Sequence, residues 1–379
     1  MPFGLDTSYL EFQDEARAVC ETVAPFAADA DAMSSVHQGV FDALAGSRLW
    51  ELVVPASHGG RHERVDPLAI AVVREVLMGT SSHLDSLFAL QGIGSYAITS
   101  GGTAAQKDAW LPRVLTGEAL AALALTEPEA GSDLKSITTA LSRDRGGYLL
   151  NGEKAYISNG GAAAFYSVLA REGDGYTMVL VPADSPGLTI TATPELASPH
   201  VLGDLTFDAV AVDPEQRMGE PGRGFELVLA TLAVFRLSVA GASLGLAQAA
   251  LEEAVQHATN RRQFGKPLAR QGAVAEMLAD SWAELEAARL LTYRAGELAR
   301  ENPAAALHHS SMAKLTASEA AGRIVDRAVQ IMGRWGLVRE SKIERLTRQA
   351  RPMRIYEGAS QVLRLGIARA LVDELTRES

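Results

Sequence analysis

The chain has 379 residues, of which 47% are hydrophobic and 21% charged, and a chain with this much apolar material is not disordered as a whole. Acidic residues outnumber basic ones by 46 to 35, which gives a net charge of −11. Because no long run of Lys and Arg offsets this charge, a phosphate backbone would repel the chain, and nucleic-acid binding is disfavoured. At roughly 150 residues per domain, the length predicts two or three domains.

The chain contains a single cysteine, Cys20, so an intramolecular disulfide and a thiolate metal cluster are excluded. We expect Cys20 to serve as a small apolar residue on an N-terminal helix rather than as a reactive thiol. We predict no metal site, because the histidines lack metal-like partners. The histidines considered are His83, His200, His308 and His309.

Targeting and membrane signals are not visible in the sequence. The first six residues carry neither the basic nor the apolar segment of a secretory signal. The longer apolar runs include Ala119–Leu125, which is far shorter than the ~18–20 residues that a bilayer crossing requires. We therefore expect a cytoplasmic protein that does not bind membranes.

Helical periodicity extends from Ser8 to about Gly117. Apolar residues that recur every three or four positions mark one face of the first helix; they are Phe12, Ala16, Val19, Val23 and Phe26. Further helices are predicted at Gln38–Ala45, Pro67–Met78 and Ala104–Leu115, separated by Gly and Ser clusters.

From about Glu118 to Pro221 the apolar pattern changes to the period of two that is typical of strands. Leu149–Ile157 is predicted to form a hairpin around Asn151-Gly152, because Asn-Gly suits the positive φ angles of a type I′ turn. The other strands are predicted at Phe165–Ala170, Tyr176–Val181, Leu188–Ala192 and Leu205–Val212.

After Gly222-Arg223-Gly224 the helical period returns and continues to the C-terminus. Four long helices joined by short loops favour an antiparallel four-helix bundle; their markers are Phe225 to Phe235, Leu278 to Leu285, Ala317 to Ile324 and Val362 to Leu371. The predicted fold is mainly α with a central β domain. Its parts are an N-terminal α-helical domain (1–117), a central β domain (118–222) and a C-terminal four-helix bundle (223–379).

Two stretches in the central region are suited to a cofactor. Leu125–Asp133 ends an apolar run in a turn of small residues beside a hydroxyl, and such a turn lets backbone amides approach a pyrophosphate; an ordinary turn has the same spacing. Within Asn151–Gly160, Tyr156 and Ser158 stand before a second Asn-Gly. An aromatic ring beside a hydroxyl suits a flat cofactor, and an exposed strand end is the alternative.

Three later stretches hold further candidates. Asn260–Pro267 interrupts a helix with a basic cluster, which commonly complements the dipole of a helix C-terminus. Gln330–Gly336 contains Gly-Arg-Trp-Gly, and Arg354–Gln361 places Glu357 in a short loop before the last amphipathic helix. A single Glu in a loop is usually no more than a solvated charge.

Taken together, in this order and at these separations, the five stretches resemble those of the acyl-CoA dehydrogenase family of flavoproteins. The resemblance covers nearly the whole chain and implies the family's fold of N-terminal helices, a β-barrel-like middle domain and a C-terminal four-helix bundle. It also implies FAD as the cofactor and α,β-desaturation of an acyl thioester as the reaction.

The resemblance assigns several residues to FAD. Leu125 and Thr126 are expected to contact the isoalloxazine ring, and Ser132 to lie near the pyrophosphate and the pantetheine arm of the thioester. Tyr156 is expected to pack on the flavin and Ser158 to hydrogen-bond its N5 edge. The other residues assigned to FAD, most of them across a subunit interface, are Arg261, Gln263, Phe264, Gln330, Gly333 and Gln361.

Glu357 matches the catalytic base of the family. Desaturation removes a weakly acidic α-proton and a β-hydride, and no side chain accepts a hydride, so the flavin N5 must take it. A carboxylate becomes a stronger base when bound substrate excludes water and raises its pKa. The resemblance also implies that the backbone N–H of Glu357 and a ribityl hydroxyl of FAD meet the thioester carbonyl, and it assigns the adjacent Gly358 to the substrate.

Some family members carry the base on the first bundle helix, where this chain has Phe235. Phenylalanine cannot accept a proton, which favours Glu357. We expect Phe235 to shorten the acyl cavity and favour short acyl groups, and Arg236 to orient the thioester or the base loop. The resemblance implies that Ser86–Ser95 lines part of the acyl pocket.

Four departures from the family pattern stand out. Ala359 replaces a common Thr, Arg334 a common Gly, and Gln349 a common Asp. Glu195–Asp204 lacks the usual Gly-x-Arg-x-Ser signature. Because that hairpin often lies along the carrier arm, the predicted substrate is an acyl thioester of either coenzyme A or an acyl carrier protein.

The resemblance implies an electron-transfer flavoprotein as electron acceptor and a homotetramer or homodimer, in which assembly and FAD retention depend on each other. One alternative on the same fold is a flavin-dependent monooxygenase or oxidase. Another is a flavin-binding subunit that only completes a partner's site. Glu357 argues against the monooxygenases, whose members generally lack it, and together with the flavin-edge residues it argues against the subunit.

Overall fold

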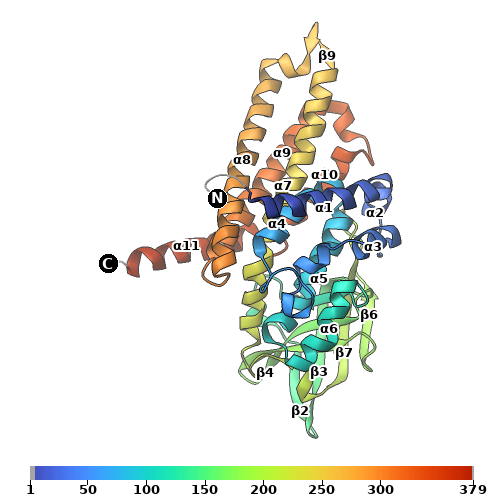
Figure 1. Cartoon of the computed structure of the whole chain (residues 1–379), viewed down its shortest axis with the longest axis vertical. Coiled ribbons are helices and arrows are strands. Elements are labelled where there is room, and N and C mark those ends of the chain that lie inside the picture. The colour runs from blue at the N-terminus through green and yellow to red at the C-terminus, as the bar shows by residue number, and fades with distance from the viewer. Residues whose placement is uncertain (1–4, 378–379) are drawn as a thin grey trace. The chain divides into compact units, whose positions relative to one another are not determined.

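The computed structural model describes residues 5–377 (Figure 1). These residues divide into two compact units. The first unit holds the residues up to Ala28, Pro67–Asp85 and the chain from Arg236 onward. The second unit holds Asp29–Asp66 and Ser86–Phe235. Among the described residues, helices α2, α5 and α7 contribute to both units.

An eight-stranded sheet forms the centre of the second unit. Its strands are β1 (Ala121–Ala124), β2 (Ala140–Asp144), β3 (Gly147–Ser158), β4 (Phe165–Glu172), β5 (Gly175–Pro182), β6 (Leu188–Ala192), β7 (Leu202–Val212) and β8 (Arg217–Met218). They follow the order β6-β7-β3-β2-β4-β5-β8, and β1 pairs in parallel with β4. The inward side chains, which include Leu150, Tyr166 and Leu205, form one apolar core, as alternation along half-buried strands dictates.

The predicted hairpin at Asn151-Gly152 is wrong, because both residues lie inside the continuous strand β3. Gly152 has φ +141°, and the register between β3 and β7 shifts there, so the dipeptide forms a β-bulge. Asn151 Oδ1 accepts a hydrogen bond of 2.8 Å from the Ala209 N–H, which ties the bulge to β7. The real turn, between β2 and β3, uses Arg145 and Gly146 at φ +37° and +99°. A preference for positive φ serves a bulge as well as a turn.

The other predicted strands are confirmed. β4 and β5 pair antiparallel around a turn that contains Gly173 at φ +58°, and β6 pairs with β7. The sequence analysis misses β1 and β2, which are only four and five residues long. Over such lengths the period of two is hard to distinguish from a loop.

The predicted helices are confirmed, whereas α5 and α10 are not delimited by the sequence pattern. The longer helices are α1 (Thr7–Val23), α3 (Gln38–Ala45), α4 (Pro67–Thr80), α5 (Ser82–Gly101), α6 (Ala104–Thr116), α7 (Gly224–Asn260), α8 (Gly272–Glu301), α9 (Leu307–Met332), α10 (Lys342–Ala350) and α11 (Ser360–Arg377), and α2 (Ala27–Asp31) is short. α6 shows why its bounds are readable. Thr103 and Gln106 form a capping box at its start, and Gly117 at φ +78° ends it.

In the first unit, α7, α8 and α9 pack with α4 around an alanine-rich core. α4 approaches α7 so closely that a Cβ on Gly241 would lie 2.1 Å from the Ala71 carbonyl oxygen, so only glycine fits there. Cys20 on α1 is 8% exposed, and burial raises the pKa of its thiol to about 11. It is therefore an unreactive buried residue, as expected.

α7 is the one helix within the described residues that is long and apolar enough to cross a bilayer. However, 72% of its most apolar window is buried inside the protein, as in the core helix of a globular protein. Counting uninterrupted apolar runs misses this helix, because Ser238 and Ser243 interrupt its apolar sequence.

A buried ion pair links α4 to the start of α5. Arg74 donates 2.8 and 2.6 Å hydrogen bonds to the two carboxylate oxygens of Asp85, and another of 2.9 Å to Ser238 Oγ. The side chains of Arg74 and Asp85 are 5% and 2% exposed. Removal of one partner would therefore leave a buried charge without compensation.

We expect Asp85→Ala to lower the free energy of unfolding by about 3–5 kcal/mol, measured by chemical denaturation with FAD present. The matched control is Asp14→Ala, which removes a carboxylate that is 73% exposed in its pair with Arg17. Because exposed pairs contribute little, the control should leave the midpoint unchanged. Equal effects of the two substitutions would contradict the prediction.

Candidate functional site

Leu125 and Thr126 follow strand β1 directly and are held by strand β3. The Ala155 N–H donates a 2.9 Å hydrogen bond to the Thr126 carbonyl, and Lys154 Nζ donates one of 2.8 Å to the Leu125 carbonyl. Both Leu125 and Thr126 are half-buried. The structure thus brings the first predicted cofactor stretch beside the second.

A buried ion pair beneath these residues fixes the turn that follows them. Glu127 Oε1 lies 3.0 Å from Lys154 Nζ, and the two side chains are 4% and 0% exposed. The Glu127 carboxylate also accepts hydrogen bonds of 2.6 and 2.8 Å from the Thr138 N–H and hydroxyl and one of 2.9 Å from the Thr139 N–H. The Glu127 carboxylate therefore joins the two ends of the loop from Glu127 to Thr139.

The pKa values of the pair reflect this environment. Burial alone would raise the pKa of Glu127, but the hydrogen bonds from Thr138 and Thr139 and the Lys154 charge outweigh it and lower the pKa to about 2. Burial lowers the pKa of Lys154 to about 8, against the opposing effect of Glu127. The pair stays ionised at neutral pH.

Tyr156 and Ser158 lie at the end of β3. Tyr156 has φ +56° and is 50% exposed, and its N–H donates a 2.8 Å hydrogen bond to Asp204 Oδ1. Ser158 is half-buried, and its Oγ lies 3.1 Å from His200 Nε2. An exposed ring and a hydroxyl thus lie two residues apart on a strand end whose backbone is held by the hydrogen bond to Asp204.

Sequence reasoning misses Asp204 and His200 as members of this site. Both belong to the stretch that departs from the family signature. His200 precedes β7 and Asp204 lies near its start, where β7 pairs with the end of β3 and Ser158 pairs with Leu202. Gly160 and Gly203 make this contact so close that a Cβ on Gly160 would lie 2.4 Å from the Gly203 nitrogen. Only the pairing of the two strands reveals it, and no local sequence signal does.

The predicted cofactor residues of the second unit carry groups that suit a flavin. It offers an exposed aromatic face (Tyr156), hydroxyls from Thr126 and Ser158, and exposed Ser132 beside Gly131, around which no atom lies within 4 Å of a built Cβ. A flat ring needs a stacking partner and few polar contacts, and a pyrophosphate needs backbone that it can approach closely. The chemistry of five predicted residues is therefore compatible with FAD binding: Leu125, Thr126, Ser132, Tyr156 and Ser158.

Glu357 lies in the first unit, in the loop between the 3₁₀ turn η8 (Pro352–Arg354) and α11. Glu357 and Gly358 have φ +53° and +104°. Arg236 Nε donates a 2.9 Å hydrogen bond to the Glu357 main-chain carbonyl, and Lys314 Nζ donates one of 2.7 Å to the Gly358 carbonyl. The interaction of Arg236 with the loop agrees with the second of its two predicted roles.

The side chain of Glu357 itself is half-buried among cations. Burial lowers the pKa of Arg236, and the Glu357 charge opposes this effect; the same charge acts on Lys314 and on Arg74. Across the described residues, no ion pair involves the Glu357 carboxylate itself. It is therefore available to accept a proton from a substrate.

The residues that the resemblance assigns to a neighbouring subunit's FAD point away from their own chain's core. Phe264, in the turn between β9 (Arg262–Gln263) and β10 (Lys266–Pro267), is 93% exposed. Gln330 and Gly333 lie at the end of α9, where Gly333 has φ +58°. The members of this set are all exposed: Arg261, Gln263, Phe264, Gln330 and Gly333. Gln361, which is predicted to bind FAD without an assigned subunit, is also exposed.

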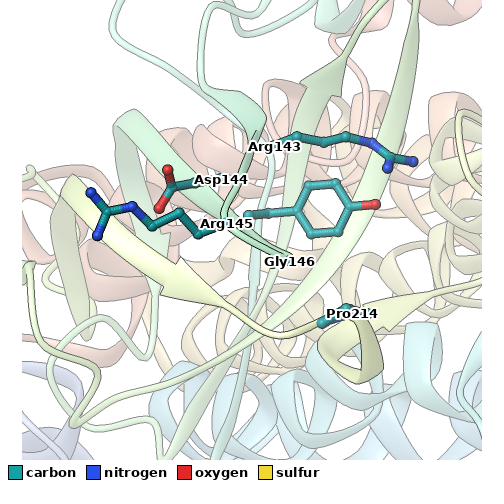
Figure 2. A pocket seen from close by; sticks show the side chains of 7 residues that line it. Arg143, Asp144, Arg145, Gly146 and Pro214 are labelled. Atoms are coloured by element: carbon teal, nitrogen blue, oxygen red, sulfur yellow. The ribbon is translucent and has the colours of Figure 1, made fainter.

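A separate pocket of about 250 Å³ lies at the β2–β3 turn. Its lining includes Arg143, Asp144, Arg145 and Tyr148, but Figure 2 shows that the Arg143 and Arg145 side chains extend in opposite directions. The two guanidinium groups do not converge on one ligand. No predicted site residue lines this pocket, and within residues 5–377 no group of three or more His, Cys, Asp or Glu side chains is placed to hold a metal ion.

Comparison with known protein families agrees with this architecture. Residues 7–118 match the model for the N-terminal domain of acyl-CoA dehydrogenase, 122–210 the middle domain and 222–372 the C-terminal domain. The chain belongs to the acyl-CoA dehydrogenase family. It is thus an oxidoreductase that acts on CH–CH bonds, with the mainly α fold and central β domain predicted above. The limits at 117/118 and 222/223 stay predictions.

Members of the family cover almost the whole chain. Cyclohexane-1-carbonyl-CoA dehydrogenase of Geobacter metallireducens is 33% identical over 367 residues, which are 94% of this chain and 95% of the relative. The structure of butyryl-CoA dehydrogenase from Megasphaera elsdenii has a TM-score of 0.93 at 31% identity and covers 98% of this chain and 100% of that one. Glutaryl-CoA dehydrogenase of Mycobacterium smegmatis in complex with FADH2 has a TM-score of 0.90 at 25% identity, covering 97% and 95%. FAD is thus a cofactor of this family.

The Glu127–Lys154 pair predicts an acid-dependent loss of stability. Because folding lowers the pKa of Glu127 from 4.5 to about 2, its contribution is complete above pH 4.5 and is lost as the pH falls toward 2. We expect Glu127→Gln to lower the free energy of unfolding by roughly 1–3 kcal/mol at neutral pH. The difference from wild type should shrink as the pH falls from 4.5 toward 2.

The measurement is urea denaturation across this pH range. Glu129→Gln is the matched control, because Glu129 is an exposed carboxylate of the same loop. A difference between wild type and Glu127→Gln that stays constant with pH would show that the carboxylate charge does not stabilise the loop.

Proposed function

We propose that this chain is an FAD-dependent acyl-CoA dehydrogenase in which Glu357 removes the α-proton of an acyl-CoA thioester. The observation that carries this assignment is the loop of Glu357. Its main chain is held by Arg236 and Lys314, while its carboxylate has no ion-pair partner in the described chain. A base needs a fixed position and an unshared lone pair, and this loop provides both.

The chemistry of desaturation divides between Glu357 and the cofactor. Bound FAD supplies the acceptor for the β-hydride at N5. Glu357 takes the α-proton on a carboxylate oxygen, and the thioester carbonyl gains negative charge as the proton leaves. In the described residues the N–H of Glu357 has no hydrogen-bond partner, which supports its proposed role as a donor to that carbonyl.

The second unit supplies the proposed flavin contacts. Tyr156 offers its exposed ring for stacking, Ser158 offers a hydroxyl for the N5 edge, and Leu125 and Thr126 line the ring. Ser132 is proposed to serve the pyrophosphate and the pantetheine arm. The hydrogen bonds from Ala155 and Lys154 to this segment support the proposal, because they fix these groups before any ligand arrives.

Phe235 supports a small acyl group. Its ring is 0% exposed and lies edge-on to Tyr96 of α5, with centroids 5.6 Å apart. A Cβ on Gly92 would lie 2.4 Å from the Phe235 ring, so the ring fills the space beside α5, within the segment Ser86–Ser95. The butyryl and cyclohexane-carbonyl groups named for two relatives are also small.

Coenzyme A is the proposed carrier. The names of the compared relatives specify CoA thioesters. The departure at Glu195–Asp204, which raised the acyl carrier protein as an alternative, has a structural use here, because His200 and Asp204 hydrogen-bond to β3. The altered signature therefore does not require a different carrier.

The proposed assembly is a homotetramer or homodimer in the cytoplasm, with an electron-transfer flavoprotein as acceptor. Exposed apolar side chains of the first unit support an interface between copies. Several of them lie on α11, which Figure 1 shows extending away from α8 and α9, and one lies on the turn after α7. These side chains are Leu365, Val372 and Leu375 on α11 and Phe264 on the turn.

The decisive test mixes purified holoprotein with butyryl-CoA without oxygen. After mixing, the wild-type protein should lose the visible absorption of oxidised FAD without any addition of oxygen. Because Gln cannot take the proton, Glu357→Gln should reduce this rate by about 10²–10⁴-fold with unchanged FAD content. Wild-type flavin that stays oxidised until oxygen is added would favour the monooxygenase alternative, and unimpaired Glu357→Gln would remove Glu357 as the base.

Phe235→Ala should extend the acyl-length profile. Removing the ring opens space beside Tyr96 and Gly92, so kcat/KM should rise for longer thioesters relative to butyryl-CoA. The cavity also costs about 3–5 kcal/mol of stability, so each rate is referred to the fraction of protein with bound FAD. Phe165→Ala is the matched control, because Phe165 is an equally buried ring on β4 whose aromatic neighbour is Trp110. An unchanged length profile in Phe235→Ala would contradict the role of this ring.

A further inference from the structure

Lys314 is a fully buried charge of the first unit that donates to a main-chain carbonyl. It lies on α9 with 0% exposure, and its Nζ donates a 2.7 Å hydrogen bond to the Gly358 main-chain carbonyl. A buried ammonium is costly unless its donors are satisfied. Lys154, the other fully buried lysine, has the Glu127 carboxylate at 3.0 Å, whereas Lys314 is bonded to the loop of the proposed base.

Two consecutive carbonyls of that loop are therefore bound to two cations. Arg236 holds the carbonyl of Glu357 and Lys314 that of Gly358. In a planar trans peptide the N–H points opposite to the C=O, so the N–H groups of Gly358 and Ala359 point away from the cations. Glu357 and Gly358 both have positive φ angles. This conformation is unfavourable for Glu357, which is not a glycine, so the surrounding hydrogen bonds must stabilise it.

We propose that Lys314 is a positioning residue for the reaction, because its ammonium holds the Gly358 carbonyl and thereby fixes the left-handed backbone from which Glu357 projects. This inference rests on the proposed role of Glu357 as the base. Arg236 anchors one side of the peptide pair and is itself oriented by its 3.1 Å hydrogen bond to Ser311 Oγ. Lys314 anchors the other side, and without it the Gly358 peptide is free to rotate.

The charge of Lys314 is sensitive to pH. The charged groups that act on it are Glu357 in the loop, Arg236 on α7 and Glu319 on α9 itself. Burial lowers the pKa of Lys314 to about 8; Glu357 opposes this effect and Arg236 adds to it. A neutral amine still donates a hydrogen bond, but a weaker one than the ammonium, so the hold on Gly358 should weaken above pH 8.

The experiment compares Lys314→Met, Lys314→Gln and the control Lys342→Met, each as holoprotein. Lys342 is a partly exposed lysine of the same unit that pairs with Glu253. The readouts are the anaerobic rate of flavin bleaching by butyryl-CoA from about pH 6.5 to about pH 9.5, the KM, the FAD content and the melting temperature. Displacement of a base by ~1 Å costs up to about 10²-fold in rate.

We expect Lys314→Met to bleach about 10–100-fold more slowly, with KM, FAD content and melting temperature close to wild type. Lys314→Gln, which keeps a neutral donor, should recover part of the rate. Wild type and Lys342→Met should slow above pH 8, whereas the rates of Lys314→Met and Lys314→Gln should not show this alkaline decline.

Two results would overturn the inference. One is a Lys314→Met enzyme with the wild-type rate and the wild-type alkaline decline. The other is a loss of rate in both Lys314 variants that only follows lost FAD and a lower melting temperature, which would assign Lys314 a structural role. Failure of the base assignment is distinguished by Glu357→Gln: if that variant bleaches normally, the proposed function fails whatever Lys314 does, and if it is inactive while Lys314→Met is normal, only the present inference fails.

Discussion

A buried ammonium that must be satisfied by a main-chain carbonyl is the constraint on which both candidate loops depend. In the second unit Lys154 donates to the carbonyl of Leu125, and in the first unit Lys314 donates to that of Gly358. Neither lysine is reached by solvent, so a loop that moved away would leave a charged donor unpaired in the interior. That penalty is larger than the gain from an ordinary hydrogen bond, and it opposes the movement of each loop.

The two lysines differ in what balances their charge, and the difference suits the two kinds of loop. Lys154 belongs to a closed network with Glu127, Thr138 and Thr139, which is appropriate for a segment that only has to present a surface to a ligand. At Lys314 and Arg236 the cations bind main-chain oxygens instead. The carboxylate of Glu357 therefore has cations near it but no ion-pair partner among the described residues, so its oxygens stay available to accept a proton.

The sequence predicted most of the fold because its elements are long and periodic. α7, α8 and α9 each repeat their apolar pattern over 26 residues or more, whereas β1 and β2 are too short for a period of two to be recognised. Asn151-Gly152 shows a different limit, since the local preference was understood correctly but the sheet uses it for a bulge inside β3. The sequence of a dipeptide indicates which φ angles its residues favour, but it does not show whether the chain reverses direction there.

The candidate site was predictable where a residue's chemistry is visible in its own motif and not where it depends on a partner far along the chain. Tyr156 and Ser158 were singled out from their motif and Glu357 from the family resemblance, and their roles stay predictions. Lys314 was not, because a lysine in an amphipathic helix usually lies in solvent, and only the packing of α9 against the Glu357 loop buries it. His200 was considered only for metal binding, and its contact with Ser158 spans 42 positions through the pairing of β3 with β7.

The predicted cofactor residues differ in what holds them in place, and this difference bears on how the enzyme must assemble. Thr126 and Ser158 are half-buried and are fixed by hydrogen bonds within their own unit. Phe264 and Gln330 are exposed at the ends of α7 and α9, and an aromatic ring that is 93% exposed is unfavourable unless another surface covers it. If a second copy supplies that surface together with its FAD, as we propose, one contact both covers the ring and completes the cofactor site. Loss of FAD and dissociation of the copies would then be two aspects of a single equilibrium, because a ligand held across an interface stabilises the assembled form by mass action.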